Sequence, residues 1–450
     1  MGLLDVPGRT GEVAVVGLGR SGSAATRLIR AAGVEVYASD GGNGAGLEAT
    51  AAALRALGAD VQVGGHDLGR IAAARLVVLS PGVPPSAPPV QAARDAGVPI
   101  WAEAELGLRV LGDDLPYVAI TGTNGKTTTT ALVGQLLEAA GRRARTAGNI
   151  GTPLCEIALA AERPDVLAVE LSSFQLHDMP TVRPTVGVLT NLAPDHLDRY
   201  PSLEDYYGDK LRMFANASAD SFWVTNGDDP ESERWVPATR GRRRRFSTSG
   251  PADGWFDRST TTLRIGDVPV IDRAKFPLLG DHNVANALAA ALAVHAIGVP
   301  VAAITVGLGR AAALKHRMEP IREVGGVLWL NDSKATNISS TEVAIAAMDR
   351  PFVLLLGGRH KGEPYTRLAD RLGRCRAVIA YGEAKPLIVA DLRGSVDVVE
   401  GGSFDDVMAR AAGLARPGDA VLLSPACSSY DMFANYEERG ARFRAIVEGM

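Results

Sequence analysis

The sequence has few cysteines, and their arrangement excludes two common kinds of scaffold. Cys155, Cys375 and Cys427 are far apart and odd in number, so neither a disulfide framework nor a zinc-binding spacing is present. The chain also shows no charged-then-apolar leader at its start and no apolar run of about 18 residues. We therefore expect a protein of a reducing, cytoplasmic compartment, without membrane insertion.

Neither sign of charge dominates the sequence. The formal net charge is −4 over 450 residues, which argues against a general nucleic-acid-binding protein but allows local nucleotide binding. Hydrophobic residues make up 46% of the chain and charged residues 22%, values that are ordinary for a globular protein. No internal repeat or low-complexity tract stands out. A chain of this length is expected to form two or three domains, each with its own core.

What the sequence does contain is a phosphate-loop pattern, AITGTNGKTTTT at 119–130, between a β-prone run and a helical apolar pattern. Gly122 and Gly125 would let backbone N–H groups turn toward an anion at a helix N-terminus. Lys126 would reach the β- and γ-phosphates of a nucleotide, and the Thr127 hydroxyl would face Mg²⁺. The spacing is shorter than in G-x-x-x-x-G-K-[ST]. A plain turn that caps a helix is the alternative, but it gives Lys-Thr at the helix start little purpose.

The N-terminal part of the chain carries a second glycine loop. Gly17, Gly19 and Gly22 follow a β-prone run in the spacing G-x-G-x-x-G, and the next strand pattern ends at Asp40. This arrangement favours a nucleotide-like ligand with Asp40 on a ribose. The motif alone is weak, because it marks a tight turn with close helix–strand packing. An NAD-dependent oxidoreductase therefore stays open as an alternative at this point.

Further strand and helix patterns alternate after this loop and predict an open parallel α/β sheet. The turn Ser80-Pro-Gly82 follows the strand pattern at 76–79, at the edge where such sheets bind ligands, although a simple chain reversal is equally consistent. The polar, proline-containing stretch 111–116 indicates a domain boundary.

Polar residues also follow the strands of the middle region. Glu170 ends the strand pattern 166–170, where it could bind magnesium or act as a base, or be a buried acid paired with a basic residue. Asp195, His196 and Asp198 cluster after the next strand and suggest metal or phosphate chemistry. Lys210 shares a helical face with Tyr206, and by itself it has the pattern of a solvated lysine.

A helix N-terminus and four more strands complete the pattern. Two asparagines three residues apart, Asn283 and Asn286, open an alanine-rich helix that they could cap, or they could bind a purine edge. Each of the four strand patterns ends in a polar loop, so they predict a second doubly wound sheet with a ligand edge. These strands are expected at 327–330, 352–356, 377–380 and 420–423.

Six motifs together resemble the Mur ligase superfamily, over about residues 10 to 445. They are GTNGKT at 122–127, ELSSFQL at 170–176, NLAPDHLD at 191–198, HNVAN at 282–286, HRME at 316–319 and NDSKATN at 331–337. The last of these, combined with SPACSSYD at 424–431, resembles the member of the superfamily that adds D-glutamate to UDP-N-acetylmuramoyl-L-alanine.

The resemblance implies three α/β domains and an ADP-forming ligase of peptidoglycan precursor synthesis. The domains would be a Rossmann-like one for the UDP substrate (1–113), a central P-loop ATPase-like one with a mostly parallel sheet (114–314) and a Rossmann-like one for the amino acid (315–450). The substrate carboxylate would attack the γ-phosphate of ATP, and the amine of D-glutamate would displace phosphate from the acyl phosphate. We expect a monomer that uses two Mg²⁺ ions and closes its third domain on ATP. Another amino-acid ligase of the superfamily, or a folylpolyglutamate synthetase, is the alternative.

The resemblance also implies roles for individual residues. The catalytic set is Lys126, Glu170, His196, Lys210 and Lys334. The ATP-binding set is Gly122, Thr123, Asn124, Gly125, Lys126, Thr127, Thr128, Asn283, Asn286, Arg317 and Asp332. Thr127 and Glu170 would bind one Mg²⁺, and His196 with a carbamylated Lys210 the other. The substrate-binding set is Ser21, Asp40, Gly82, Asn149, Ser172, Gln175, His196, Thr336, Lys361, Ser429, Tyr430 and Tyr436.

Two positions depart from the family pattern. Gly41 follows Asp40 where a polar side chain would help to hold uracil, so that contact is expected from the backbone or from neighbouring groups. Arg20 replaces a more apolar residue beside the first glycine loop. A catalytically silent phosphate-loop scaffold is a further alternative, against which the intact set of Lys126, Glu170, His196 and Lys210 argues.

Overall fold

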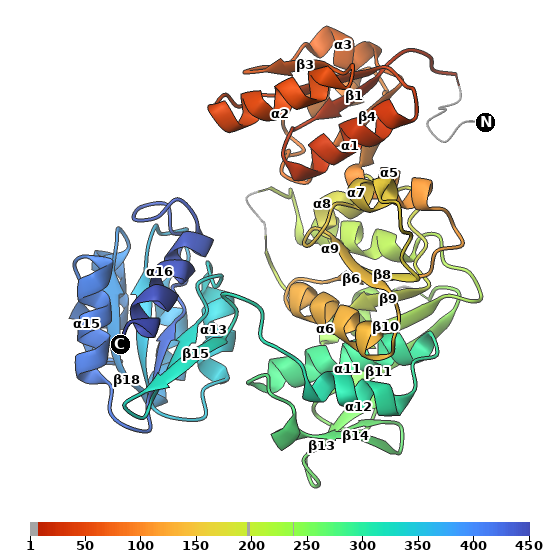
Figure 1. Ribbon diagram of the computed structural model, residues 1–450. Coiled ribbons are helices and arrows are strands. Elements are labelled where there is room, and N and C mark those ends of the chain that lie inside the picture. Colours follow the sequence, from red (N-terminus) through yellow and green to blue (C-terminus); the bar gives the residue numbers. More distant parts are fainter. Residues whose placement is uncertain (1–7, 196–198, 237) are drawn as a thin grey trace. The chain divides into compact units, whose positions relative to one another are not determined.

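The chain folds into three sheets flanked by helices in a computed structural model, which describes residues 8–195, 199–236 and 238–450 (Figure 1). These sheets belong to two compact units. The first unit holds the chain up to Lys275 together with Ala285–Gly309, and the second holds Phe276–Val284 and Arg310–Met450. The predicted α/β class with mostly parallel sheets is confirmed. Among the described residues, no helix is both long and apolar enough for a membrane span.

The first sheet has five parallel strands in the order β3-β2-β1-β4-β5. Alternate residues of the central strand β1 belong to different apolar clusters, Val13 and Val15 to one and Ala14 and Val16 to the other, so both faces are buried. The strands are β1 (Val13–Val16), β2 (Val36–Asp40), β3 (Asp60–Val63), β4 (Leu76–Leu79) and β5 (Ile100–Ala102). The helices are α1 (Arg20–Ala31), α2 (Ala45–Ala56), α3 (Leu68–Ala73), α4 (Pro88–Asp95) and α5 (Glu103–Leu111).

The second sheet has nine strands in the order β14-β13-β12-β11-β10-β9-β6-β8-β7. It is parallel except where β13 pairs with β12 and with β14. The strands are β6 (Tyr117–Thr121), β7 (Ala144–Gly148), β8 (Val166–Glu170), β9 (Val186–Leu189), β10 (Phe222–Asn226), β11 (Arg242–Ser247), β12 (Gly254–Asp257), β13 (Thr262–Ile265) and β14 (Val268–Asp272). The helices are α6 (Lys126–Ala139), α7 (Leu154–Leu159), α8 (Ser173–His177), α9 (Leu203–Leu211), α10 (Pro230–Trp235), α11 (Asp281–Ala296) and α12 (Val301–Gly309), with short 3-10 turns η1 (Arg212–Phe214) and η2 (Arg273–Lys275).

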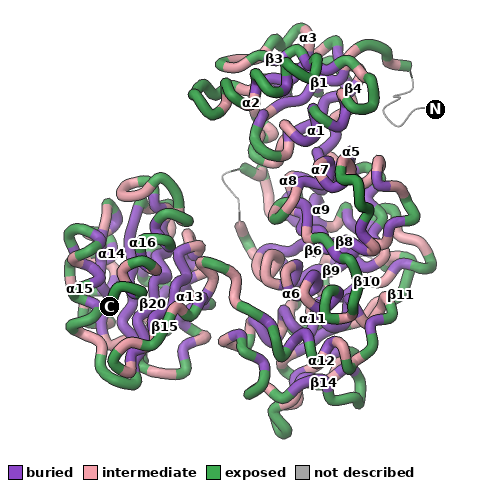
Figure 2. Tube along the Cα trace, viewed as in Figure 1, coloured by how far each residue is buried: buried purple, intermediate pink, exposed green. Residues whose placement is uncertain are grey.

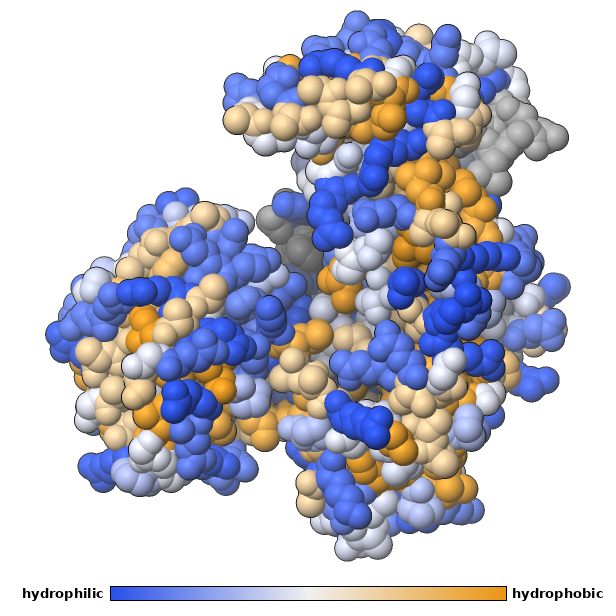
Figure 3. All heavy atoms as spheres, in the orientation of Figure 1, coloured by the Kyte–Doolittle hydropathy of each residue, from blue (hydrophilic) through white to orange (hydrophobic). Residues whose placement is uncertain are grey.

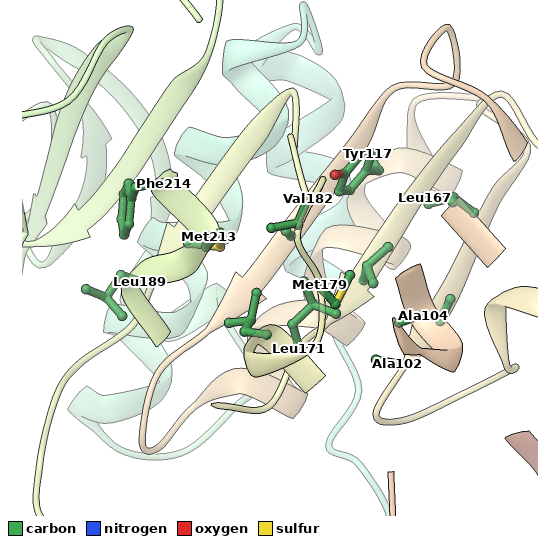
Figure 4. Packing of buried hydrophobic residues seen from close by; sticks show 14 of the residues in the cluster. Ala102, Ala104, Tyr117, Leu167, Leu171, Met179, Val182, Leu189, Met213 and Phe214 are labelled. Carbon is green, nitrogen blue, oxygen red and sulfur yellow. The ribbon is translucent and has the colours of Figure 1, made fainter. Parts of the chain in front are cut away.

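A tight helix pair joins the first sheet to the second inside the first unit. Helix α5 passes so close to α7 that a Cβ on Gly107 would lie 2.5 Å from the Leu154 Cβ. Beside this contact the Cys155 N–H donates to Glu103 Oε1 at 2.6 Å, and burial raises the pKa of Glu103 to about 7. The core under the second sheet includes Ala102 and Ala104 from this joint, as Figure 4 shows.

The third sheet lies in the second unit, in the order β15-β16-β20-β17-β18-β19, with only β15 antiparallel to its neighbour. All four predicted strands are present here, and the outer strands β15 and β19 are additional. The strands are β15 (Glu319–Val324), β16 (Val327–Asn331), β17 (Phe352–Gly357), β18 (Cys375–Tyr381), β19 (Val398–Glu400) and β20 (Ala420–Leu423). The helices are α13 (Ile338–Ala346), η3 (Tyr365–Arg374), α14 (Lys385–Leu392), α15 (Phe404–Leu414) and α16 (Tyr436–Glu448).

Burial follows the strands in all three sheets. In Figure 2 the buried segments run along the strands, and the exposed segments gather in loops and on outer helix faces. The surface seen in Figure 3 shows hydrophilic and hydrophobic side chains interspersed. In parallel sheets of this kind, ligands bind at the carboxyl ends of the strands, so the polar loops there are where charged side chains can meet a ligand.

Candidate active site

The phosphate-loop pattern forms the predicted strand, loop and helix, from β6 to α6. Gly122 and Gly125 have φ values of +141° and +83°, which side chains rarely allow. A Cβ on Gly122 would lie 2.0 Å from Thr190 Oγ1, and one on Gly125 would lie 2.4 Å from Asn286 Oδ1. Both glycines are therefore required by the crowding around the loop as well as by its backbone.

The end of the neighbouring strand β9 holds this loop in place. Asn191 Oδ1 accepts from the Asn124 N–H at 2.9 Å, and Asn191 Nδ2 donates to the Asn124 carbonyl at 3.0 Å. Thr190 Oγ1 donates to the same carbonyl at 2.6 Å, and the Thr123 N–H donates to the Asn191 carbonyl at 2.9 Å. Asn191 is thus a site residue that the sequence analysis placed in a motif without a role. Its position directly after a strand was the available signal.

Two lysines converge on one carbonyl of the loop. Lys126 Nζ donates to the carbonyls of Gly122 at 2.8 Å and Thr123 at 2.7 Å, and Lys210 Nζ donates to the Gly122 carbonyl at 2.9 Å. Lys210 is only 1% exposed, with its ammonium 4.4 Å from the centre of the Tyr206 ring. Burial first, and the positive charge of Lys126 second, hold the pKa of Lys210 well below its usual range. The pattern of a solvated lysine is therefore wrong for this residue.

Glu170 provides a carboxylate oxygen beside the loop, at the end of β8. Strand β8 pairs directly with β6, and the Glu170 side chain is 1% exposed. Asn149 Nδ2 donates to Oε1 at 2.9 Å, whereas buried Oε2 has no hydrogen-bond partner among the described residues. A buried, unpartnered carboxylate oxygen suits a bound cation better than a closed ion pair does.

The rest of the predicted metal set is less complete. Thr127 is the second residue of α6, and His196 lies outside the described residues. The described residues contain no group of three His, Cys, Asp or Glu side chains placed to hold a metal ion. A metal here would therefore need Glu170 together with hydroxyl, water, phosphate or modified-lysine oxygens.

One predicted substrate residue of the first unit, Gln175, lines a cavity. Gln175 and Ser172 form a capping box at the start of α8, and buried Gln175 Nε2 has no partner among the described residues. The cavity is lined from the first sheet by Leu79, Ser80, Pro81, Val83, Pro85 and Ala102, and from the middle region by Phe174, Gln175 and Asp178. An unpartnered amide donor of a lining residue could bind a carbonyl oxygen of a ligand. Gly82 adjoins this lining, between Pro81 and Val83.

Asp40 is occupied by the backbone around it. Its Oδ2 accepts from the Leu18 N–H at 2.7 Å, and its Oδ1 accepts from the Gly42 N–H at 2.8 Å. The carboxylate therefore ties the first glycine loop to the loop after β2. Its ribose contact stays a prediction, as does the role of Ser21, which lies in the first turn of α1.

The helix that opens at Asp281 carries the two predicted asparagines in different settings. Asn286 Oδ1 accepts from Thr129 Oγ1 at 3.2 Å, close to the phosphate loop. Asn283 Nδ2 donates to the Leu279 carbonyl at 2.7 Å. The contacts of Asn286 support the loop itself, and the adenine-side role of both residues stays a prediction.

In the second unit, Asp332 is buried at the end of β16. It accepts from the Met318 N–H at 3.1 Å and from Ser424 Oγ at 2.9 Å. Burial raises the pKa of Asp332 to about 7. Arg317 lies between His316 and Met318, whose positive φ values of 64° and 43° are strained for residues other than glycine. Such strain is typical of segments whose conformation serves a site.

The remaining predicted catalytic and substrate-binding residues of the second unit lie on loops at the carboxyl edge of this third sheet, except Tyr436, which is the first residue of α16. Lys361 Nζ donates to Thr336 Oγ1 at 3.3 Å, so these two meet. The Lys334 ammonium lies 5.0 Å from the centre of the Tyr436 ring. Ser429 is buried, whereas Tyr430 is 64% exposed.

Arg439 on α16 is a residue that the sequence analysis missed. Its guanidinium is fully buried and donates to Ser333 Oγ at 2.9 Å, to the Ser333 carbonyl at 2.8 Å and to the Cys427 carbonyl at 3.2 Å. One arginine thus fastens the loop after β16 to the loop after β20. An arginine in a polar helix carries no local signal for such burial.

Three family descriptions match successive parts of the chain. "Mur ligase MurD-like, N-terminal domain" matches residues 11–102, "Mur ligase middle domain" matches 120–294 and "Mur ligase, glutamate ligase domain" matches 316–427. The curated relatives include UDP-N-acetylmuramoylalanine--D-glutamate ligases of Anaeromyxobacter dehalogenans and Myxococcus xanthus. The first is 43% identical and the match covers 97% of both chains, and the second is 40% identical over 98% of both.

Solved structures share the fold at lower identity. The UDP-N-acetylmuramate-alanine ligase MurC of Thermotoga maritima is 18% identical with a TM-score of 0.63, and the match covers 97% of this chain and 99% of that one. A pseudomurein peptide ligase type C of Methanothermus fervidus is 18% identical with a TM-score of 0.61, over 98% of this chain and 100% of that one.

Proposed function

Because this chain belongs to the Mur ligase family, we propose that it adds D-glutamate to UDP-N-acetylmuramoyl-L-alanine with conversion of ATP to ADP and phosphate, in peptidoglycan precursor synthesis. Relatives that carry this activity in their names match over nearly the whole chain at about two residues in five. Family membership also sets aside an NAD-dependent oxidoreductase. The observation that supports the proposal most strongly is the phosphate loop with Lys126, Lys210 and the open oxygen of Glu170 around it.

The reaction is a problem of bringing anions together. The substrate carboxylate attacks the γ-phosphorus, the bond to ADP breaks, and an acyl phosphate forms. The amine of D-glutamate then attacks the acyl carbon, phosphate leaves and the amine loses a proton. Lys126 and the N–H groups of Gly122 to Thr128 would hold the phosphates and offset the charge that develops on them.

Magnesium fits the donors beside the loop. Glu170 Oε2 and the Thr127 hydroxyl would hold one ion, which would supply positive charge to offset the charge of the nucleotide phosphates. A second ion would need His196 and a carbamate on Lys210. Carbamylation requires a neutral amine to attack CO₂ with loss of a proton, and the lowered pKa of Lys210 supports that requirement.

The remaining proposed roles follow the three sheets. The divisions 1–113, 114–314 and 315–450 would bind the UDP substrate, ATP and D-glutamate. Lys361 beside Thr336 would pair with a carboxylate of D-glutamate, with Lys334, Ser429, Tyr430 and Tyr436 nearby on the same sheet edge. Arg317 and Asp332 would bind the nucleotide. We further propose that the protein is a cytoplasmic monomer.

A phosphate-release assay tests the proposal. The enzyme is mixed with UDP-N-acetylmuramoyl-L-alanine, ATP and Mg²⁺, and each glutamate enantiomer is added in turn. We expect ADP and phosphate only with the D-enantiomer. A parallel panel of labelled amino acids tests the closest alternatives, since incorporation of L-alanine or diaminopimelate in place of D-glutamate would reject the assignment.

A further inference from the structure

A histidine that no motif singled out occupies the edge of the first sheet next to Asp40. His66 is held by its neighbours on both sides, because Gly65 bridges to Asp40 and the Asp67 N–H donates to the Tyr37 hydroxyl at 2.7 Å. The backbone at His66 is thus anchored to the end of β2. Its side chain can therefore be presented in one place without the cost of ordering a free loop.

The imidazole lies close to the space that a side chain at position 41 would take. Its Nδ1 lies 2.9 Å from the hydroxyl of buried Ser39. Its Nε2 faces Gly41, where an added Cβ would lie only 3.3 Å away. The absence of a side chain at Gly41 therefore gives room to the imidazole of a residue twenty-five positions further along the chain.

The Asp40 carboxylate is engaged by the backbone at this edge, whereas Nε2 of His66 is not used by Ser39. Both carboxylate oxygens of Asp40 already accept backbone N–H groups. The residues from Gly41 to Gly46 are exposed and mostly small, so they leave room for a flat ligand. Burial lowers the pKa of His66, with Asp40 opposing this shift, so the ring is neutral near pH 7 and carries one donor and one acceptor.

The nucleotide half of the substrate identifies the ligand chemistry. In a doubly wound sheet, phosphates lie at the glycine loop after the first strand, and the nucleoside lies toward the end of the second strand. Here those places are the Gly17–Gly22 loop and the end of β2. With Nδ1 engaged by Ser39, the neutral imidazole offers Nε2, which can meet either an N–H or a carbonyl group of a pyrimidine edge without a charge penalty.

We propose that His66 is a binding residue for the uracil base, taking the place of the side chain that Gly41 lacks. The inference rests on the proposed function, since it presumes a UDP-linked substrate. It assigns base recognition to the Gly41–His66 pair and leaves Asp40 to hold the loops together. Ser39 orients the ring through Nδ1, which leaves Nε2, on the side of Gly41, for the ligand.

Calorimetric binding of UDP-N-acetylmuramoyl-L-alanine, and of UDP alone, tests the pair. His66→Ala should weaken both ligands about tenfold, as for one lost hydrogen bond with its partner left unpaired. It should raise KM for the UDP substrate and leave KM for ATP and D-glutamate unchanged. The matched control is His295→Ala, another half-buried histidine with a lowered pKa that lies at the end of α11, which should change none of these values.

A side-chain exchange makes the test independent of simple damage. Gly41→Thr alone should weaken UDP binding, because its side chain crowds the imidazole, whereas Gly41→Thr with His66→Ala should bind better than either single variant. Wild-type affinity in His66→Ala, with the wild type binding normally, would overturn the inference and leave the proposed function standing. If the wild-type protein bound neither UDP ligand, the proposed function would fail, and this inference with it.

Discussion

Two glycine loops of this chain share a local plan and differ in what surrounds them. The Gly17–Gly22 loop lies between β1 and α1, and the Gly122–Thr127 loop lies between β6 and α6. Each helix even begins with a basic residue, Arg20 in the first and Lys126 in the second. A cation at a helix N-terminus opposes the helix dipole, so its presence needs a reason beyond stability.

The side chains around the two loops differ in charge and in hydrogen bonding. At the first loop, both carboxylate oxygens of Asp40 accept backbone N–H groups. The exposed Arg20 side chain makes no hydrogen bond or ion pair with the residues that the structure describes. At the second loop two lysines donate to loop carbonyls, and a buried oxygen of Glu170 stays open. The same backbone motif can therefore bind a ligand through the shape of its backbone in one place, and can support phosphoryl transfer through charged neighbours in another.

The largest expected effect is on kcat, and it should distinguish Lys126 from Arg20. Lys126→Met should lower kcat by about a thousandfold, because the lysine offsets charge that develops on the transferred phosphoryl group. Arg20→Met should change the KM for the UDP substrate by a few-fold at most. Steady-state ADP release measures both. Comparable losses of kcat in the two variants would remove the proposed difference between the loops.

The stability of the contact between α5 and α7, which joins the first sheet to the second, should depend on pH. The folded pKa of Glu103 is raised to about 7, above the ordinary value of 4.5 that it regains on unfolding. The native state therefore holds this proton over a wider range, and stability should fall by about 3 kcal/mol as pH rises from 4.5 through 7. Glu103→Gln should flatten this part of the curve in urea unfolding at several pH values. An unchanged slope in Glu103→Gln would show that another group causes the pH dependence.

Lys210 tests the charge chemistry of the second loop. Lys210→Ala should lower kcat by about a hundredfold, the scale for losing a group that supports metal binding. Short carboxylic acids added to this variant should restore part of the activity, because they can stand in for a carbamate. Lys385→Ala is a matched control, since that lysine pairs with Glu400 on the second unit. If the acids restored nothing, the carbamate would be rejected.

The smallest effects are expected at Asp40 and Asn191, the side chains that hold the first and the second loop by hydrogen bonds. Asp40→Asn removes a charge-assisted hydrogen bond at the first loop, and Asn191→Ala removes two bonds at the second. Each should cost on the order of 1 kcal/mol of stability. Asp40→Asn should raise KM only for the UDP substrate, and Asn191→Ala only for ATP. A variant that raised both values equally would indicate that the loops are coupled.

Local patterns predicted much of this molecule. The strand at 166–170 and the helix that starts at Lys126 were expected where they occur, because buried parallel strands and helix starts leave short-range signals. Strands β15 and β19 were not expected, since β15 is half polar at an edge and β19 is only three residues long. Edge strands need less apolar sequence than central ones, so their signal is weak.

The sequence by itself determined the two glycine loops, because left-handed backbone and tight turns require glycine wherever they occur. It also carried the motifs that mark the chemistry. Only the tertiary structure decided that Lys210 is buried beside Lys126, that Arg439 joins two distant loops and that His66 faces Gly41. Desolvation and hydrogen-bond partners depend on which residues meet across the fold, and no local pattern of a polar side chain records its distant neighbours.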